Sequence, residues 1–232
     1  MSLPATTHLL VDGARAAELP QAPGIHDVER VDDDGRRTRF TLALPAAPAP
    51  APPLLVVLHY AGQPTRFYGR PLLEQLFVPA FGALGAVMVA PESLGGQWTE
   101  PANEAWVIGL TDTLVAAYAV DANRVAIGGY SMGAIGSWQL AADYPERFGA
   151  LLPLAGLPAG PVEATQPTRV LATPADELFA FERFEALAAE CRATGRDVEL
   201  VAVPAQGHYD VGAFRGALAA LAPWLAARWQ VP

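Results

Sequence analysis

The sequence predicts an α/β fold, in which helices cover both faces of a mostly parallel central sheet. From residue 54 onward, short apolar runs alternate with longer amphipathic stretches, as strands alternate with helices in such folds. These runs are apolar at nearly every position, which is typical of strands buried on both faces. The chain has 232 residues, of which 52% are apolar, so we expect one domain.

An antiparallel hairpin is expected over residues 25–44, where apolar side chains recur at every second position from Phe40 to Leu44. The hairpin would form an antiparallel edge of the sheet. Residues 25–232, which begin with this hairpin, would form the core of the domain, and residues 1–24 would form an N-terminal extension.

The remaining elements alternate along the chain. Strands are predicted at residues 54–58, 86–89, 125–127, 150–154, 170–172 and 198–203. Helices are predicted at residues 71–84, 103–119, 132–143, 179–194 and 211–229. Pro223 is expected to kink or divide the last helix. Ligands of such sheets bind at the carboxyl ends of the strands, so the functional residues are sought there.

Composition excludes several function classes. The formal charge of −9, with no basic cluster on any predicted face, disfavours binding to nucleic acid or to anionic membranes. Lysine is absent, which excludes a Ser/Lys dyad, Schiff-base chemistry and a phosphate-loop lysine. The single cysteine, Cys191, excludes internal disulfides and any cysteine-based metal cluster.

The amino-terminal residues do not have the pattern of a signal peptide. The short apolar run at residues 9–11 ends at Asp12 and has no positively charged region before it. No apolar run approaches the length needed to cross a bilayer. These features predict a cytoplasmic protein.

The strand predicted at residues 125–127 leads into Gly-Tyr-Ser-Met-Gly at residues 129–133, and a helical pattern begins directly afterwards. This is a GxSxG motif in a strand–turn–helix context. Small residues two positions either side of a serine let the strand and the helix approach closely around a strained turn. The amino end of the helix then directs backbone N–H groups at developing negative charge. Ser131 is therefore the predicted nucleophile.

His208 is the predicted general base. It is the only histidine that follows Ser131, and in this type of site the acid and then the histidine follow the nucleophile along the chain. It lies after the last predicted strand, where an imidazole would reach over the strand ends. Asp176, in the turn that leaves the preceding strand, is the predicted acid that accepts the imidazole N–H. Glu177 is its nearest rival.

Two backbone N–H groups are expected to stabilise an oxyanion. One belongs to Met132, directly after the nucleophile. The second should come from the loop that follows the strand at residues 54–58, and Ala61 is its predicted donor. His59 lies in the same loop and is expected to be structural rather than catalytic, because it precedes Ser131.

Three motifs occur in the expected order, at residues 129–133, 172–179 and 206–210. They read Gly-Tyr-Ser-Met-Gly, Ala-Thr-Pro-Ala-Asp-Glu-Leu-Phe and Gln-Gly-His-Tyr-Asp. With them, the chain from about residue 25 to its end resembles the α/β-hydrolase superfamily. Pro-Glu-Ser at residues 91–93, together with the serine motif, looks like the compact phospholipase/carboxylesterase group and the feruloyl-esterase-like or predicted-peptidase proteins.

The resemblance implies a triad of Ser131, Asp176 and His208, with Ala61 and Met132 as backbone donors. Members of these families have His-Gly in the oxyanion loop, whereas here Tyr60 follows His59, and its ring is expected to wall the pocket. Dienelactone hydrolases share the fold but use a cysteine nucleophile. Cys191 falls within a helical pattern outside any such turn, which argues against that chemistry.

The predicted cleft is open. Residues 156–167, about a dozen, join two strands where many relatives insert a cap, so we expect no lid and no interfacial activation.

Trp98 follows a strand and is interpreted either as a pocket wall or as a packing tryptophan beneath a loop. Tyr209, beside the base, is a weaker substrate-binding candidate. His208 and Asp210 lack a third ligand, so no metal is expected.

The leading functional hypothesis is a serine carboxylic-ester hydrolase that acts on small soluble esters through an acyl-enzyme and needs no cofactor. A small serine peptidase or acyl-peptide hydrolase with the same triad is the alternative. A catalytically silent ligand-binding protein with the hydrolase fold is a third hypothesis. The sequence leaves the oligomeric state undetermined.

Overall fold

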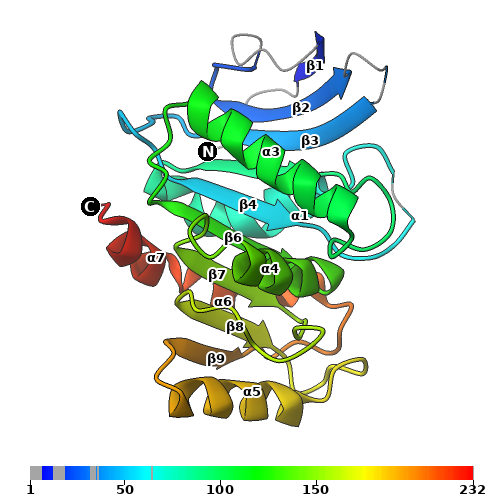
Figure 1. Ribbon diagram of the computed structural model, residues 1–232, viewed down its shortest axis with the longest axis vertical. Coiled ribbons are helices and arrows are strands. Elements are labelled where there is room, and N and C mark those ends of the chain that lie inside the picture. The colour runs from blue at the N-terminus through cyan, green and yellow to red at the C-terminus, as the bar shows by residue number, and fades with distance from the viewer. Residues whose placement is uncertain (1–6, 13–18, 32–34, 36, 64, 232) are drawn as a thin grey trace.

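The computed structural model describes residues 7–12, 19–31, 35, 37–63 and 65–231, and within these ranges nine strands form one sheet (Figure 1). The strand order across the sheet is β1-β2-β3-β5-β4-β6-β7-β8-β9. The strands are β1 (Thr7–Asp12), β2 (Gly24–Val31), β3 (Arg37–Leu44), β4 (Leu54–Leu58), β5 (Val87–Pro91), β6 (Val125–Tyr130), β7 (Ala150–Leu154), β8 (Thr168–Ala172) and β9 (Val198–Ala202).

The mostly parallel sheet and the antiparallel hairpin predicted from the sequence are both confirmed. The six strands from β5 across to β9 pair in parallel with their neighbours. β2 and β3 form the hairpin, and β3 also pairs antiparallel with β5. Residues 32–34 of the hairpin turn lie outside the described residues.

One strand was not predicted. β1 lies within the expected N-terminal extension and pairs in parallel with β2, so the hairpin does not form the edge of the sheet. Its sequence, Thr-His-Leu-Leu-Val-Asp, lacks the strict alternation of a half-buried strand. A strand of this kind depends on pairing with an existing sheet edge, which a local pattern does not reveal.

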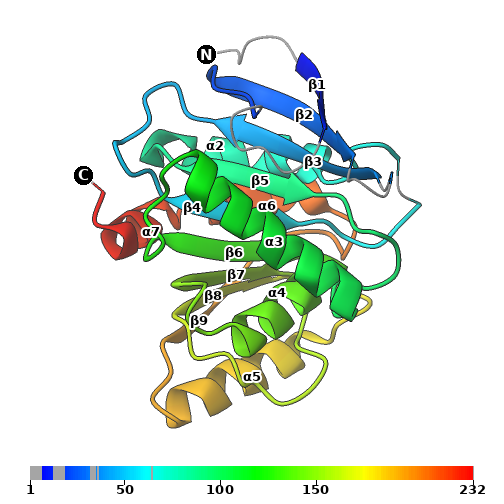
Figure 2. The same cartoon turned by 45° about the horizontal axis from the view of Figure 1, so that its top comes forward.

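Helices lie on both faces of the sheet (Figures 1 and 2). One face is covered by α3 (Pro101–Ala117), α4 (Met132–Asp143) and α5 (Phe181–Ala193), and the other by the helical residues 70–84, α6 (Phe214–Ala219) and α7 (Ala222–Trp229). Within β4, Leu54, Val56 and Leu58 face the first core, whereas Leu55 and Val57 face the second. Burial on both faces explains why the run is apolar at every position.

The predicted helix at residues 71–84 is irregular. It comprises α1 (Arg70–Leu72), a π-helical stretch (Leu73–Phe77), α2 (Val78–Phe81) and a 3₁₀ turn (Gly82–Leu84). Pro79 has no N–H to donate to the carbonyl of Gln75, four residues earlier. Arg215 of α6 donates its Nε–H to that carbonyl at 2.9 Å instead, which joins α6 to this segment.

The predicted helix at residues 211–229 is divided, as Pro223 indicated. A 3₁₀ turn (Val211–Ala213) leads into α6, and α7 begins at Ala222 with Pro223 in its first turn. In one continuous helix, the ring of Pro223 would clash with the carbonyl group of Ala219, four residues earlier, so the helix is interrupted after Ala219.

The connection from β7 to β8, residues 155–167, contains no helix or strand, so the absence of a cap is confirmed. The carboxyl ends of the strands are therefore not covered by an inserted domain at this point. Within the described ranges, none of the helices is both long and apolar enough to span a bilayer.

The loop after β4 is fixed by His59, which is almost fully buried. Ser93 donates its backbone N–H to His59 Nε2 at 3.1 Å, so that nitrogen carries no proton. The proton is then on Nδ1, which donates to the carbonyl of Tyr60 at 2.8 Å. The indole N–H of Trp98 donates to the carbonyl of His59 at 2.9 Å. A neutral imidazole therefore joins the loops that follow β4 and β5, and His59 is structural, as expected.

We predict that the free energy of unfolding decreases as the pH falls below about 6.5, the usual pKa of a histidine. Burial lowers the pKa of His59 in the folded chain, so the unfolded chain binds this proton first. The stabilisation is complete above the unfolded pKa and is lost as the pH falls toward the folded one. Urea unfolding between about pH 8 and about pH 5 measures the effect.

The matched variant is His59→Gln, which keeps a polar side chain but does not titrate. It should flatten the pH dependence by at most about 1.4 kcal/mol per pH unit, the limit for one proton. The same pH dependence in both proteins would contradict a neutral, buried His59.

Candidate active site

Ser131 occupies the sharp turn between β6 and α4, with a φ of 53° and a ψ of −114°. A positive φ costs a non-glycine residue on the order of 1–3 kcal/mol, so surrounding contacts must hold it. Its N–H donates to the carbonyl of Leu154 in β7 at 2.8 Å, and its carbonyl accepts the N–H of Ile135 in α4 at 3.0 Å. The strained turn expected from the motif is present.

The two glycines of the motif let β6, α4 and β4 meet. A Cβ atom on Gly133 would lie 2.0 Å from the carbonyl oxygen of Leu58. A Cβ atom on Gly129 would lie 2.6 Å from that oxygen and from the carbonyl carbon of Gly133. Any side chain at either position would push the helix away from the strands and displace Ser131.

The structure brings Ser131, His208 and Asp176 together from three separate turns at the carboxyl ends of the strands. His208 Nε2 lies 2.8 Å from Ser131 Oγ, and His208 Nδ1 lies 2.8 Å from Asp176 Oδ2. The side chains of His208 and Asp176 are 4% and 0% exposed, so water competes little for these bonds. In this arrangement the imidazole can take the proton of the hydroxyl while the carboxylate orients the ring.

Asp176 is oriented by its own turn. Its Oδ1 accepts the backbone N–H groups of Leu178 and Phe179, both at 2.9 Å, which leaves Oδ2 for the histidine. These bonds satisfy a carboxylate that would be costly to bury without partners. Glu177, the rival acid, accepts the backbone N–H of His208 at 2.7 Å rather than the ring N–H. The geometry favours Asp176 as the partner of the imidazole.

The predicted oxyanion donors lie on neighbouring elements. Met132 is the first residue of α4, so its N–H has no acceptor within the helix. β4 pairs with β6 as far as Leu58 and Gly129, and the exposed loop containing Ala61 therefore starts beside Ser131. The assignment of these two N–H groups as oxyanion donors stays a prediction.

Tyr60 stands where glycine was expected from the resemblance, and it does so without backbone strain. It is not one of the described non-glycine residues with a positive φ. Its half-buried ring lies edge-on to Tyr68 and Tyr130, with centroid distances of 5.5 and 6.2 Å. A side chain at position 60 is therefore compatible with the loop.

Trp98 is the packing tryptophan, and its assignment as a substrate-binding residue is wrong in this structure. It is fully buried, and its ring lies 4.8 Å from that of His59. A Cβ atom on Gly136 would lie 2.2 Å from Trp98 Cβ, so the glycine makes room for the tryptophan beneath the loop. The local sequence Gly-Gly-Gln-Trp is compatible with either role, and only the close approach of α4 decides between them.

Two large apolar side chains are exposed beside His208. Tyr209 is 75% exposed, with its ring edge-on to His208 at 5.3 Å. Sequence reasoning missed Leu178, which is 54% exposed, and Phe179, whose ring lies 5.6 Å from that of His208. They lie two and three residues after Asp176, but no periodic pattern distinguishes them from other loop residues.

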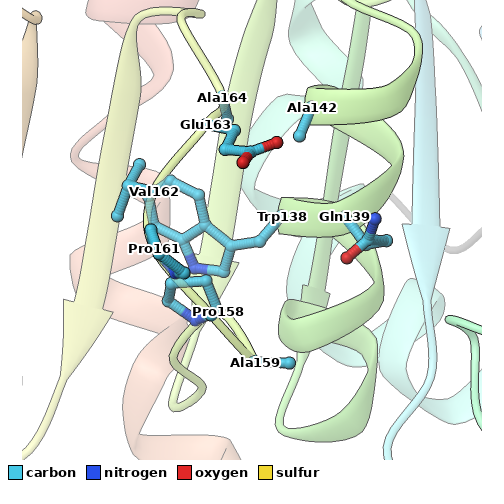
Figure 3. Close-up of a pocket in the computed structure, with 10 residues that line it drawn as sticks. Trp138, Gln139, Ala142, Pro158, Ala159, Pro161, Val162, Glu163 and Ala164 are labelled. Atoms are coloured by element: carbon cyan, nitrogen blue, oxygen red, sulfur yellow. The ribbon is translucent and has the colours of Figure 1, made fainter.

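A separate cavity of about 240 Å³ lies between α4 and the loop that joins β7 to β8 (Figure 3). Trp138 and Gln139 line it from the helix, and Pro158, Val162 and Glu163 line it from the loop. None of the predicted site residues lines this cavity. In the part of the chain that the structure describes, no three His, Cys, Asp or Glu side chains are grouped as metal ligands.

No family model matches the sequence, and no curated protein matches it. Solved structures do match. A thermostable esterase is 22% identical with a TM-score of 0.68; the match covers 88% of this chain and 62% of that one, so this chain spans less than two thirds of its length. Est1E from Butyrivibrio proteoclasticus is 15% identical with a TM-score of 0.66, over 87% of this chain and 99% of that one.

FphF, a fluorophosphonate-binding serine hydrolase of Staphylococcus aureus, is 10% identical with a TM-score of 0.69, over 88% of this chain and 99% of that one. At identities this low, similarity of structure establishes the fold rather than the activity. Together with the sheet order, the strained turn at Ser131 and the absence of a cap, these matches show that the chain has the α/β-hydrolase fold.

Proposed function

We propose that the chain is a serine hydrolase that cleaves carboxylic esters, with Ser131 as nucleophile, His208 as general base and Asp176 as its acid partner. The continuous chain of hydrogen bonds from Asp176 through His208 to Ser131 carries the proposal. The similar solved structures support it, because they include esterases and serine hydrolases.

The geometry suits a two-step reaction through an acyl-enzyme. His208 takes the proton of Ser131 Oγ as that oxygen attacks the ester carbonyl, and Asp176 stabilises the resulting imidazolium. The N–H groups of Met132 and Ala61 would bind the oxyanion. His208 then protonates the leaving alcohol as the C–O bond of the ester breaks. In the second step His208 takes a proton from water, which attacks the acyl-enzyme, and the acid leaves as the bond to Ser131 Oγ breaks and that oxygen regains its proton. No cofactor is needed.

Small soluble esters are the proposed substrates. The connection of residues 155–167 forms no cap, so a substrate can reach Ser131 without the opening of a lid at this connection. We propose that residues 25–232 act as a single catalytic domain, to which β1 adds an edge strand, and that the protein works in the cytoplasm. The low cysteine content supports that compartment.

We predict that a fluorophosphonate probe labels Ser131, because a hydroxyl activated by an imidazole attacks the phosphorus as it would a carbonyl. Mass spectrometry of the digested protein locates the adduct. Ser131→Ala should abolish labelling and lower kcat by at least about 10³-fold, and Asp176→Asn should also cause a large loss.

Ser137→Ala is the matched control, because Ser137 lies on α4, the helix that follows Ser131, and its hydroxyl donates to the carbonyl of Ala134 at 2.8 Å. This variant should label like the wild type. A folded wild-type protein without an adduct on Ser131 would contradict the proposal and favour a silent binding protein.

We expect a p-nitrophenyl acyl ester to be turned over at least about 100-fold faster than the matching anilide, because p-nitrophenoxide leaves more readily than the nitrogen of the anilide and the described residues of the site show no feature specific to amides. The ratio of kcat/KM for the two substrates measures this. A ratio near one would favour the peptidase alternative.

We predict that Tyr209 and Leu178 contact an apolar part of the substrate. Within the described residues, they are the two large hydrophobic side chains that are exposed, and both adjoin the triad. Tyr209→Ala and Leu178→Ala should raise KM about 3- to 10-fold for a longer acyl ester, the loss expected for about 1 kcal/mol of apolar contact. The same KM change for p-nitrophenyl acetate would contradict an acyl-chain contact.

A further inference from the structure

His208 lies in the loop of residues 203–210, between β9 and the 3₁₀ turn, and has no helix or strand of its own. Its ring must nevertheless stay within hydrogen-bond distance of both Ser131 and Asp176. A catalytic group needs to be held within about 0.5 Å of its working position. Two side chains bind the backbone of His208, one from the end of β6 and one from the turn after β8, on opposite sides of its Cα atom.

Tyr130 holds the carbonyl group of His208. Its hydroxyl donates to that oxygen at 2.7 Å. The tyrosine is 1% exposed, and its ring packs edge-on against Phe214 at a centroid distance of 5.1 Å, so the hydroxyl cannot move without repacking the core. Burial and the neighbouring carboxylates raise the pKa of Tyr130, so the hydroxyl stays protonated and remains a donor.

Glu177 holds the N–H group of His208. Its Oε2 accepts this N–H at 2.7 Å, a charge-assisted bond that is stronger than one between neutral groups. A Cβ atom on Gly207 would lie 2.9 Å from the same oxygen. The glycine therefore allows the carboxylate to lie close against the peptide that precedes His208.

We propose that Tyr130 and Glu177 are positioning residues, which hold the ring of His208 within hydrogen-bond distance of its two triad partners. The inference rests on the proposed function. Tyr130 directly precedes Ser131, and Glu177 directly follows Asp176. Each of these two segments therefore supplies one side chain to the triad and a neighbouring one to the backbone of His208, so the three groups are held as one unit.

The test measures kcat and KM with p-nitrophenyl acetate. Glu177→Ala removes the acceptor, and kcat should fall about 10-fold with KM changed less than about twofold, because the base is displaced while the substrate contacts remain. Glu177→Gln keeps an acceptor oxygen and should recover most of the lost kcat. The rate of fluorophosphonate labelling should follow kcat in each variant, since it depends on the same base.

Tyr130→Phe keeps the packing of the ring and removes only the hydroxyl. Its kcat should also fall about 10-fold. Tyr118→Phe is the matched control, because the hydroxyl of Tyr118 donates to the carbonyl of Pro20 at 2.6 Å, outside the candidate site. Thermal unfolding should show similar losses of stability in the two variants, whereas Tyr118→Phe should keep the wild-type kcat.

The inference is overturned if Tyr130→Phe and Glu177→Ala keep kcat within about twofold of the wild type, or if Tyr118→Phe loses as much activity as Tyr130→Phe. It is also overturned if Glu177→Gln fails to recover activity. These results require an active wild-type enzyme. A wild type that neither hydrolyses the ester nor reacts with the fluorophosphonate would overturn the proposed function itself.

Discussion

The close packing of α4 against β4 and β6 is the constraint on which the candidate site depends. Leu58 and Gly133 approach so closely that only a glycine fits, and this contact forces the chain to turn sharply at Ser131. The turn projects the hydroxyl beyond the sheet and starts a helix directly behind it. The strained conformation of Ser131 persists because β4 and β7, the strands on either side of β6, are buried and closely packed and cannot move to relieve the strain.

The second requirement is a buried carboxylate whose oxygens are all satisfied. Asp176 has no exposed side-chain surface, yet it accepts two backbone N–H groups from its own turn and the ring N–H of His208. Burial without these partners would be costly. With them, the low local polarity strengthens each bond and fixes the ring. The apolar rim formed by Leu178 and Tyr209 lies outside this buried unit, where side chains can change without disturbing it.

The fold was largely predictable because burial leaves a pattern in the sequence. A strand such as β4, covered on both faces, is apolar at every position, and the hairpin strands show their own periodicity. Two features were not predictable. β1 is placed by its pairing with β2, and the π-helical stretch before Pro79 has a carbonyl that binds Arg215, which lies far away in the sequence.

The sequence by itself determined the order of the proposed nucleophile, acid and base, because the motif around Ser131 is a local requirement of a sharp turn and His208 is the only histidine that follows it. Only the tertiary structure decided which neighbours serve these groups. Trp98 became a packing residue, and Tyr130 and Glu177 became partners of the His208 backbone. Those roles arise where separate turns meet, and contacts between distant turns leave no periodic signal in the chain.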